Sequence, residues 1–305
     1  MRATATVRVR VPGSTSNLGA GFDCIGVAVD RWLRVTARVA PSGPPAVERQ
    51  GTLRALVLAP EDDLLYRGFA AACRRAGREL PAGVTLVADS QIPVARGLGS
   101  SAAAAVAGAA AASALLDLGL DKATLTALCA ELEGHADNVA PAVYGGANLV
   151  LPTPDGLVVT PLVVHESLAL VFAVPDFTVE TKRARAVLPA TLPHAQAVAA
   201  AAKSAALVHG LAQGDARLLA AGFDDVLHVP YRRALVPGYD VVTAAARAAG
   251  AFGATLSGSG PTLVAVAPSA HAAAVGDAMV RAWRECGISA EAFAVARPAG
   301  GYELD

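Results

Sequence analysis

The sequence has no surplus of positive charge. It contains 25 Lys and Arg residues against 26 Asp and Glu residues, which gives a formal net charge of -1. No global positive field is therefore available to gather nucleic acid or anionic lipid, and an anionic ligand needs a local site. We expect neither a nucleic-acid partner nor a membrane partner.

Long hydrophobic runs and paired cysteines are also missing. The longest apolar stretches, such as residues 102–112, are short and consist of Ala, Val and Gly, although 54% of all residues are hydrophobic. Such runs exclude a membrane-spanning helix, and the four cysteines form no C-x-x-C pair. The first twelve residues alternate Val with Arg as a strand does, and we find no export signal in them. These features predict a reduced, cytoplasmic protein.

The pattern of apolar residues predicts an α+β chain of two domains. Strands are expected at 4–11, 27–39, 84–88, 146–151, 158–164, 168–174, 263–267 and 290–296, and helices at 64–76, 100–116, 122–133, 182–188, 194–213, 241–249 and 270–286. Strands and helices interleave, but hairpin-like pairs also occur, which favours α+β over a purely parallel sheet. The alanine tracts 102–112 and 199–206 are expected to be buried helices. Pro152, Pro154, Asp155 and Gly156 mark the expected boundary between domains 1–155 and 156–305.

A glycine-rich loop runs directly into the first alanine tract. It reads Pro93-Val-Ala-Arg96-Gly97-Leu98-Gly99-Ser100-Ser101-Ala102-Ala103. Glycines let backbone N–H groups turn toward one point, and the helix start adds positive potential there, so the segment predicts an anion site, most naturally for phosphate. The hydroxyls of Ser100 and Ser101 are then either plain helix N-caps or ligands of phosphate and Mg²⁺.

Two familiar phosphate loops fit this segment poorly. The Walker pattern is absent, since no lysine follows a glycine anywhere in the chain. Gly97 to Ala102 matches the dinucleotide fingerprint in its alanine variant, with Asp117 near the expected distance. Eight residues separate Gly97 from the preceding strand, however, which is not the tight turn that this fingerprint requires. A nucleotide-dependent oxidoreductase is therefore a weaker alternative.

Two further glycine-rich segments accompany the loop, and each alone could be an ordinary connection or turn. They are residues 11–23 and 256–262, and His135-Ala-Asp137-Asn138 stands between them in the chain. Taken together, the three segments resemble the motifs of the GHMP small-molecule kinases in order and spacing. The stretches 16–23, 133–141, 181–189 and 230–237 resemble the homoserine kinase branch of that family.

The resemblance implies a fold and a reaction. The fold is the two-domain GHMP kinase fold, with an N-terminal domain like domain 2 of ribosomal protein S5 and a ferredoxin-like C-terminal domain. The reaction is the ATP-dependent phosphorylation of the terminal hydroxyl of L-homoserine to O-phospho-L-homoserine, in threonine biosynthesis. A homodimer is expected from the resemblance. A GHMP kinase for another small alcohol and a non-catalytic binding module of the same fold are the alternatives.

The resemblance also implies roles for individual residues. The ATP site comprises Pro93, Arg96, Gly97, Leu98, Gly99, Ser100, Ser101, Ala102 and Ala103, with Asp63 in the adenine pocket. Ser101 and Glu133 hold Mg²⁺, and Asn138 lies near the reacting hydroxyl, so these three form the catalytic set. The substrate contacts are Asn17, Asp23, His135, Asn138, Arg185 and Arg232, and Ser257, Gly258, Ser259 and Gly260 form a structural motif.

Two questions stay open at this point. Arg183 and Arg233 stand beside the two substrate arginines in sequence and could replace them. Some family members use an aspartate paired with a lysine as catalytic base, and here Asp137 stands near the relevant loop but no lysine stands near the first motif. Our hypothesis is direct attack of the hydroxyl on the γ-phosphate, with Asn138 orienting it.

Overall fold

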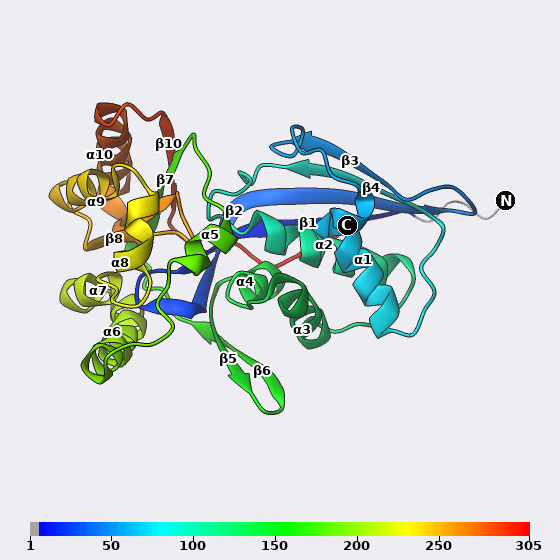
Figure 1. Cartoon of the computed structure of the whole chain (residues 1–305), viewed down its shortest axis with the longest axis horizontal. Coiled ribbons are helices and arrows are strands. Elements are labelled where there is room, and N and C mark those ends of the chain that lie inside the picture. The colour runs from blue at the N-terminus through cyan, green and yellow to red at the C-terminus, as the bar shows by residue number, and fades with distance from the viewer. Residues whose placement is uncertain (1–5) are drawn as a thin grey trace.

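The computed structural model describes residues 6–305 and shows two lobes, each built on one β-sheet (Figure 1). One sheet has seven strands and the other has four. Both contain antiparallel neighbours, so the predicted α+β class is confirmed. No helix in the described part of the chain is long and apolar enough to cross a membrane. Thr4 and Ala5, where the first strand was expected to begin, lie outside the described residues.

The seven-stranded sheet is organised around one long hairpin. Its strands are β1 (Thr6–Asn17), β2 (Gly21–Ala40), β3 (Ala46–Gly51), β4 (Gly83–Ser90), β5 (Ala147–Thr153), β6 (Gly156–Leu162) and β11 (Glu303–Leu304). The order is β11-β1-β2-β4-β3, while β5 pairs with β2 and β6 pairs with β5. Residues 11–17, whose polarity favoured a connecting loop, instead continue β1 and are buried. A side chain at Gly13 would be crowded, because a Cβ there would lie 3.0 Å from the carbonyl oxygen of Leu98.

Four helices accompany this sheet: α1 (Leu64–Arg75), α2 (Ser100–Leu115), α3 (Lys122–Glu133) and α4 (Val139–Tyr144). Residues 102–112 of α2 are buried apart from one half-buried position, which confirms the expectation for this tract. Helices α1 and α2 are in backbone contact, since a Cβ on Gly108 would lie 1.9 Å from the carbonyl oxygen of Leu65. Alanine and glycine bring α2 close to both α1 and the sheet.

The four-stranded sheet forms the second lobe. Its strands are β7 (Leu168–Pro175), β8 (Gly253–Leu256), β9 (Leu263–Pro268) and β10 (Ala290–Val295), in the antiparallel order β10-β7-β9-β8. Helices α9 (Tyr239–Ala248) and α10 (Ala272–Glu285) pack on it around the buried Trp283. Strand order and crossover helices match the expected ferredoxin-like arrangement.

Four more helices complete this lobe: α5 (Thr181–Ala186), α6 (His194–Gln213), α7 (Ala216–Phe223) and α8 (Val229–Arg232). Three short 3₁₀ turns lie at Pro60–Asp62, Arg233–Leu235 and Ser269–His271. The tract 199–206 is helical within α6, but most of its residues are exposed or half-buried, so the expectation of burial was wrong there. Alanine favours a helix whether or not the helix is covered.

The chain does not pass from the first lobe to the second at the turn-rich residues 152–156. These residues form the tip of the β5–β6 hairpin, which projects from the molecule (Figure 1), and β6 belongs to the first sheet. The chain enters the second sheet only at Leu168, and β11 returns to the first sheet. Pro, Gly and Asp mark hairpin turns as well as linkers, so the composition could not separate the two. The division at residue 155 stays a prediction about folding units.

Candidate active site

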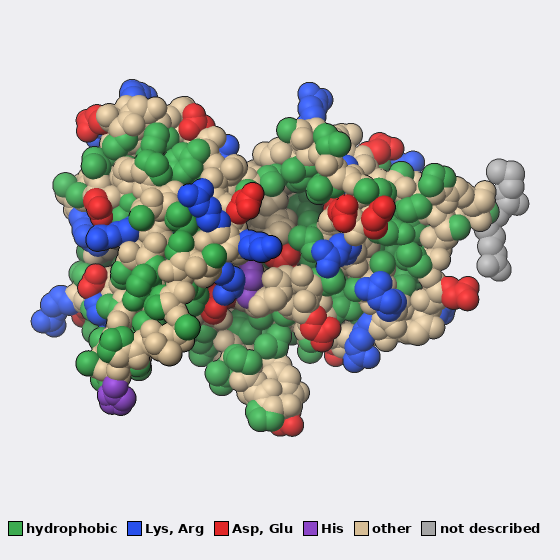
Figure 2. Space-filling model, viewed as in Figure 1, with side chains coloured by type: hydrophobic (Ala, Val, Ile, Leu, Met, Phe, Trp, Pro, Cys, Tyr) green, Lys and Arg blue, Asp and Glu red, His purple; other side chains and the backbone are tan. Residues whose placement is uncertain are grey.

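A cavity of about 320 Å³ opens between the two lobes. In Figure 2 the surface is hollowed there, and charged side chains of both signs and a histidine gather around the hollow. Its lining comes from both lobes, including β1, the loop 93–99, the start of α2, residues 135–138, α5, α8 and the loop 258–259. Segments far apart in sequence therefore meet at one site.

The loop before α2 turns its carbonyl groups away from the cavity. The oxygens of Ala95, Arg96, Gly97 and Leu98 accept hydrogen bonds from Val179 N, Thr262 N, Ser257 Oγ and Ser14 N, at 3.2, 3.4, 2.6 and 3.1 Å. The N–H groups of residues 97–102 have no hydrogen-bond partner among the described residues. Free donors at a helix start form an anion site. The loop therefore has the geometry that its sequence predicted.

Glycine is required at two positions of this loop. Gly97 and Gly99 have φ values of +76° and +67°, in the left-handed region. A Cβ on Gly97 would lie 2.1 Å from the carbonyl oxygen of Ser257, and a Cβ on Gly99 would lie 2.1 Å from Ser14 Oγ. The third glycine segment and β1 thus pack against the loop from outside the cavity.

The helix α2 begins without a side-chain cap. Its N-cap is Gly99, so the interpretation of Ser100 and Ser101 as plain N-caps was wrong. Ser101 Oγ instead donates a 2.7 Å hydrogen bond to Glu133 Oε2 at the end of α3. Burial raises the pKa of Glu133, and the bond from Ser101 acts in the opposite direction. A hydroxyl and a carboxylate side by side are hard oxygen ligands of the kind that Mg²⁺ accepts together with water and phosphate, so these residues fit that ion.

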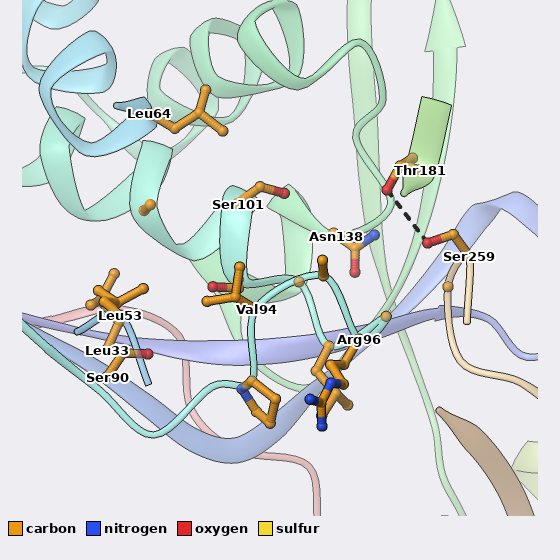
Figure 3. Close-up of a pocket in the computed structure, with 18 of the residues that line it drawn as sticks. Leu33, Leu53, Leu64, Ser90, Val94, Arg96, Ser101, Asn138, Thr181 and Ser259 are labelled. Atoms are coloured by element: carbon orange, nitrogen blue, oxygen red, sulfur yellow. Dashed lines mark hydrogen bonds between the residues drawn. The ribbon is translucent and has the colours of Figure 1, made fainter. Parts of the chain in front are cut away.

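Asn138 is held at the centre of the cavity lining (Figure 3). Its side chain accepts from Ser14 Oγ at 2.9 Å and donates to Ser16 Oγ at 2.9 Å, so both ends of the amide are fixed by β1. Asp137 Oδ1 receives His135 Nδ1 at 2.7 Å and the N–H of Asn138 at 2.9 Å.

The pair His135 and Asp137 shares one electrostatic environment. Burial tends to raise the pKa of Asp137, but the hydrogen bond and charge of His135 outweigh it and hold that pKa below its usual range. For His135, burial acts downward, and the bond to Asp137 raises the pKa overall. Both directions favour an ionised carboxylate beside an imidazolium.

Two arginines and an aspartate stand at the other side of the cavity. Arg185 on α5 makes a two-pronged ion pair with Asp23, at 3.0 and 2.9 Å, which raises the pKa of Arg185. Arg232 on α8 is 2% exposed and donates from Nε to the carbonyl oxygen of Ala184 at 3.0 Å. Burial and the charge of Arg185 lower the pKa of Arg232 to about 10. Opposite charges at fixed positions suit a zwitterion.

The neighbouring arginines do not reach this cavity. Arg183 is exposed on α5, and Arg233 is exposed and pairs with Asp240 at 3.5 Å. Only Arg185 and Arg232 of these four line the cavity. The structure therefore brings to the site the two arginines that the motifs pointed to.

An apolar compartment extends the cavity beyond the loop 93–99, here named the phosphate loop after the ligand that its sequence predicts. Figure 3 shows Leu33, Leu53 and Ser90 at this end, Ser101 and Asn138 in the middle, and Thr181 and Ser259 at the far end. Asp63 lies here, but its carboxylate caps α1 through Leu65 N and pairs with Arg49 at 2.6 Å. Asp63 therefore has a structural role that the sequence had not indicated.

Most of the remaining expected site residues line the cavity, and the others lie directly behind its lining. The cavity is lined by Pro93, Arg96, Gly97, Leu98, Gly99, Ser100, Ser101, Asn17, Asp23, His135, Gly258 and Ser259 in addition to those above. Ala102, Ala103, Ser257 and Gly260 lie behind the lining, and Glu133 reaches it through Ser101. The guanidinium of Arg96 donates to the carbonyl oxygens of Pro175 and Asp176, at 2.5 and 2.8 Å, and so ties the loop to β7.

Sequence reasoning missed several lining residues. Leu33, Val47, Leu53, Leu56 and Leu58 form the apolar compartment, and Arg49, Ser16 and Thr181 add polar groups. Thr181 Oγ lies 3.4 Å from Ser259 Oγ across the cavity. Thr181 is the first residue of the stretch 181–189 and Ser16 is the first of 16–23, and these positions were the signal that could have identified them.

Comparison with known proteins identifies the family of this chain. The model for the N-terminal domain of the GHMP kinases matches residues 63–146, and the model for the GHMP kinase C-terminal domain matches residues 207–285. A homoserine kinase of Picosynechococcus sp. is 42% identical over 289 residues, covering 93% of this chain and 94% of that protein. A homoserine kinase of Trichormus variabilis is 40% identical over 290 residues, covering 95% and 96%.

Solved structures give the same grouping. The crystal structure of homoserine kinase from Cytophaga hutchinsonii matches with a TM-score of 0.89 at 31% identity, covering 98% of this chain and 97% of that one. The structure of a mevalonate kinase from L. major has a TM-score of 0.71 at 18% identity, over 96% and 97%, and shares the fold. The predicted family resemblance is confirmed.

Proposed function

Because this chain belongs to the homoserine kinase family of the GHMP kinases, we propose that its cleft binds ATP and L-homoserine and transfers the γ-phosphoryl group to the terminal hydroxyl. The bond from that hydroxyl oxygen to the γ-phosphorus forms as the bond to the β,γ-bridging oxygen breaks. ADP, O-phospho-L-homoserine and the proton released from the hydroxyl group are the products. A homodimer in the cytoplasm remains the expectation for the assembly and its location.

The arrangement of the phosphate loop carries this proposal. Its carbonyl groups at residues 95–98 are bonded to residues that do not line the cavity, and the N–H groups of residues 97–102 have no hydrogen-bond partner among the described residues. Phosphoryl transfer depends on positioning and charge neutralisation more than on covalent chemistry, so fixed donors around the triphosphate supply much of what it needs. Ser101 and Glu133 are the residues that would hold Mg²⁺, which neutralises phosphate charge when bound.

The amino-acid end follows from the charges at the opposite wall. In our proposal Asp23 binds the ammonium group, while Arg185 and Arg232 bind the carboxylate. The side chain of Asn138 then lies between the phosphate loop and these charges, where it orients the hydroxyl. Asn17, which donates to the carbonyl oxygen of Gly258 at 2.8 Å, and His135 complete the polar lining.

A substrate panel tests the proposed reaction. ADP release is measured with Mg²⁺, ATP and each of L-homoserine, D-homoserine, L-serine, mevalonate and shikimate. We expect the highest kcat/KM for L-homoserine, because its side chain is long enough to reach from the fixed charges of Asp23, Arg185 and Arg232 to Asn138. A higher kcat/KM for mevalonate or shikimate would show that the chain phosphorylates another alcohol.

A matched pair of arginine variants tests the assignment of the carboxylate site. Arg232→Lys should raise the KM for L-homoserine by about tenfold to 100-fold, because a lysine cannot replace the planar fork. Arg233→Lys, one residue further along and exposed, should leave that KM unchanged. Equal effects of the two substitutions would remove Arg232 from the substrate site.

A further inference from the structure

A buried histidine lies directly behind the amino-acid end of the cleft. His228 immediately precedes α8, is fully buried, and does not line the cavity. None of the residue roles above uses it. Its ring nevertheless contacts two segments that carry proposed substrate groups.

The two ring nitrogens face groups of opposite hydrogen-bonding character. Nδ1 lies 3.3 Å from Nη1 of Arg232, and Nε2 lies 3.2 Å from the carbonyl oxygen of Gly19. A guanidinium only donates and a carbonyl only accepts, so Nδ1 must accept and Nε2 must donate. The neutral imidazole with its proton on Nε2 is the form that satisfies both contacts. Burial lowers the pKa of His228 to about 4, which favours a neutral ring.

The ring itself is fixed from two sides. The carboxylate of Asp225 accepts hydrogen bonds from the N–H groups of Leu227, His228 and Val229, at 3.0, 2.7 and 2.8 Å, and so fixes the backbone at the start of α8. Phe22 stacks on the imidazole with ring centroids 4.8 Å apart. Neither contact supplies a hydrogen bond to Nδ1, which leaves that nitrogen for Arg232.

His228 therefore connects the part of the chain that leads to Asp23, which in our proposal binds the ammonium group, with Arg232, which in our proposal binds the carboxylate. Gly19 belongs to the segment between β1 and β2, with Asn17 before it and Asp23 after it. This segment also rests on the end of α7, where the N–H of Ala20 donates to the carbonyl oxygen of Gly222 at 2.9 Å. Arg232 donates from Nε to the carbonyl oxygen of Ala184, and from Nη1 to His228 Nδ1 and, at 3.5 Å, to the carbonyl oxygen of Gly258. Its Nη2 has no hydrogen-bond partner among the described residues.

We propose that His228 is a positioning residue for the amino-acid substrate, holding the segment that leads into Asp23 and the guanidinium of Arg232 in one fixed relation. Both ends of the zwitterion then meet partners whose separation is already set. The inference rests on the proposed function, since it assigns His228 to the homoserine end of the cleft and not to the nucleotide end.

Two substitutions separate the hydrogen bonds of His228 from its bulk. His228→Phe keeps an aromatic ring against Phe22 but removes the donor and the acceptor, and we expect the KM for L-homoserine to rise about tenfold to 100-fold. His228→Gln retains one donor and one acceptor and should recover most of that loss. The KM for ATP should change less than twofold in both, and His209→Phe, at an exposed position on α6, serves as control.

The wild-type protein provides an independent measurement if His228→Phe does not fold. The ¹⁵N spectrum of histidine-labelled protein at pH 7.5, assigned by comparison with His228→Gln, should show His228 protonated on Nε2 and unprotonated on Nδ1. A ring protonated on Nδ1 would overturn the proposal, because Arg232 could not donate to it. An unchanged KM for L-homoserine in a folded His228→Phe protein, or an equal rise for both substrates, would overturn it as well.

The two proposals fail in different ways. If the wild-type protein does not phosphorylate L-homoserine, the proposed function is wrong, whatever the spectrum shows. If it does so and His228→Phe keeps the wild-type KM, the function stands and the role of His228 is wrong.

Discussion

Asp137 is a buried carboxylate at the centre of the site, and its hydrogen bonds oppose a role as catalytic base. It accepts from His135 and from the N–H of Asn138, and its pKa is held below the usual range. A weakly basic carboxylate is a poor proton acceptor. We expect Asp137→Asn to retain kcat within about tenfold of wild type, whereas loss of a general base costs about 10²–10⁴-fold.

Steady-state kinetics with saturating substrates provides this measurement. Unfolding temperature and the KM for L-homoserine are recorded alongside, since Asp137 also orients His135. A loss of 10³-fold or more in kcat, with folding and binding intact, would restore Asp137 as the base.

The burial of His228 also lets us predict how the free energy of unfolding depends on pH. Burial lowers its pKa to about 4, below the ordinary value of 6.5, so between these values the unfolded chain binds a proton that the folded chain does not. Stability from this residue is complete above pH 6.5 and declines as the pH falls toward 4. Between pH 7.5 and 5 the loss is on the order of 2 kcal/mol.

Urea unfolding at these two pH values measures the effect. Wild-type protein should lose more stability on acidification than His228→Gln does, by about that amount. The variant His209→Gln, at an exposed position, should follow the wild type. Equal acid sensitivity of wild type and His228→Gln would mean that His228 has the same pKa in the folded and in the unfolded chain.

Residues grouped in local motifs could be predicted, and isolated ones could not. The loop 93–103 and His135 to Asn138 are contiguous, so their chemistry is visible in sequence. Leu33, Leu53 and Leu58 come from separate segments, and a single leucine looks like any core residue. Arg185 and Arg183 differ by half a helical turn, so only the direction of α5 distinguishes them.

The close packing of α1 against α2 predicts a sensitive position far from the chemistry. A Cβ on Gly108 would lie 1.9 Å from a backbone oxygen that cannot move without shifting α1. We expect Gly108→Ala to destabilise the fold by about 1–3 kcal/mol despite the better helix propensity of alanine.

Chemical denaturation measures this effect, and Gly276→Ala on α10 is the matched control. A Cβ on Gly276 would meet Ala292 Cβ at 3.3 Å and Val171 at 3.5 Å, both side-chain contacts. That variant should be neutral or slightly more stable. If both substitutions had the same effect, backbone contact between the helices would not matter.

Long helices bounded by clear end signals, such as Asp121 and Gly134 for α3 and Pro193 and Gly214 for α6, were predicted well, and short elements were missed. The bounds of α3 and α6 were predicted to the residue, 122–133 and 194–213. Strand β3 reads AVERQG and β8 reads GATL, which give too few alternating positions to detect. Helix α4 contains Pro141 in its first turn, where proline is tolerated but the sequence looks like a break.

The C-terminal segment ties the second lobe back to the first (Figure 1). Gly146 N donates to the carbonyl oxygen of Ala299 at 2.8 Å, and Tyr302 N donates to that of Ala142, on α4, at 2.9 Å. A Cβ on Gly301 would lie 2.3 Å from the carbonyl oxygen of Val143, so the backbones touch. Helix α4 follows Asn138 directly and is therefore held partly by the end of the chain.

Gly301→Val is expected to lower both stability and kcat, because it displaces the segment from α4. The melting temperature and the kcat at saturating substrates are the measurements. Glu303→Gln, which weakens the half-exposed pair with Arg10, should change stability by less than about 1 kcal/mol and leave kcat unchanged. A Gly301→Val protein with wild-type kcat would show that the terminal contact does not position Asn138.

The outward carbonyl groups of the phosphate loop are bonded to both lobes, to Ser14 on one side and to Val179, Ser257 and Thr262 on the other. Chimaeras made by joining the first lobe of one homologue to the second lobe of another would therefore place this loop between hydrogen-bond partners that come from two different proteins. Recombination that keeps the loop and its backing strands from one parent should preserve activity, and exchange at the lobe boundary should not. The residues that must come from one parent to keep nucleotide binding therefore lie in separate parts of the chain.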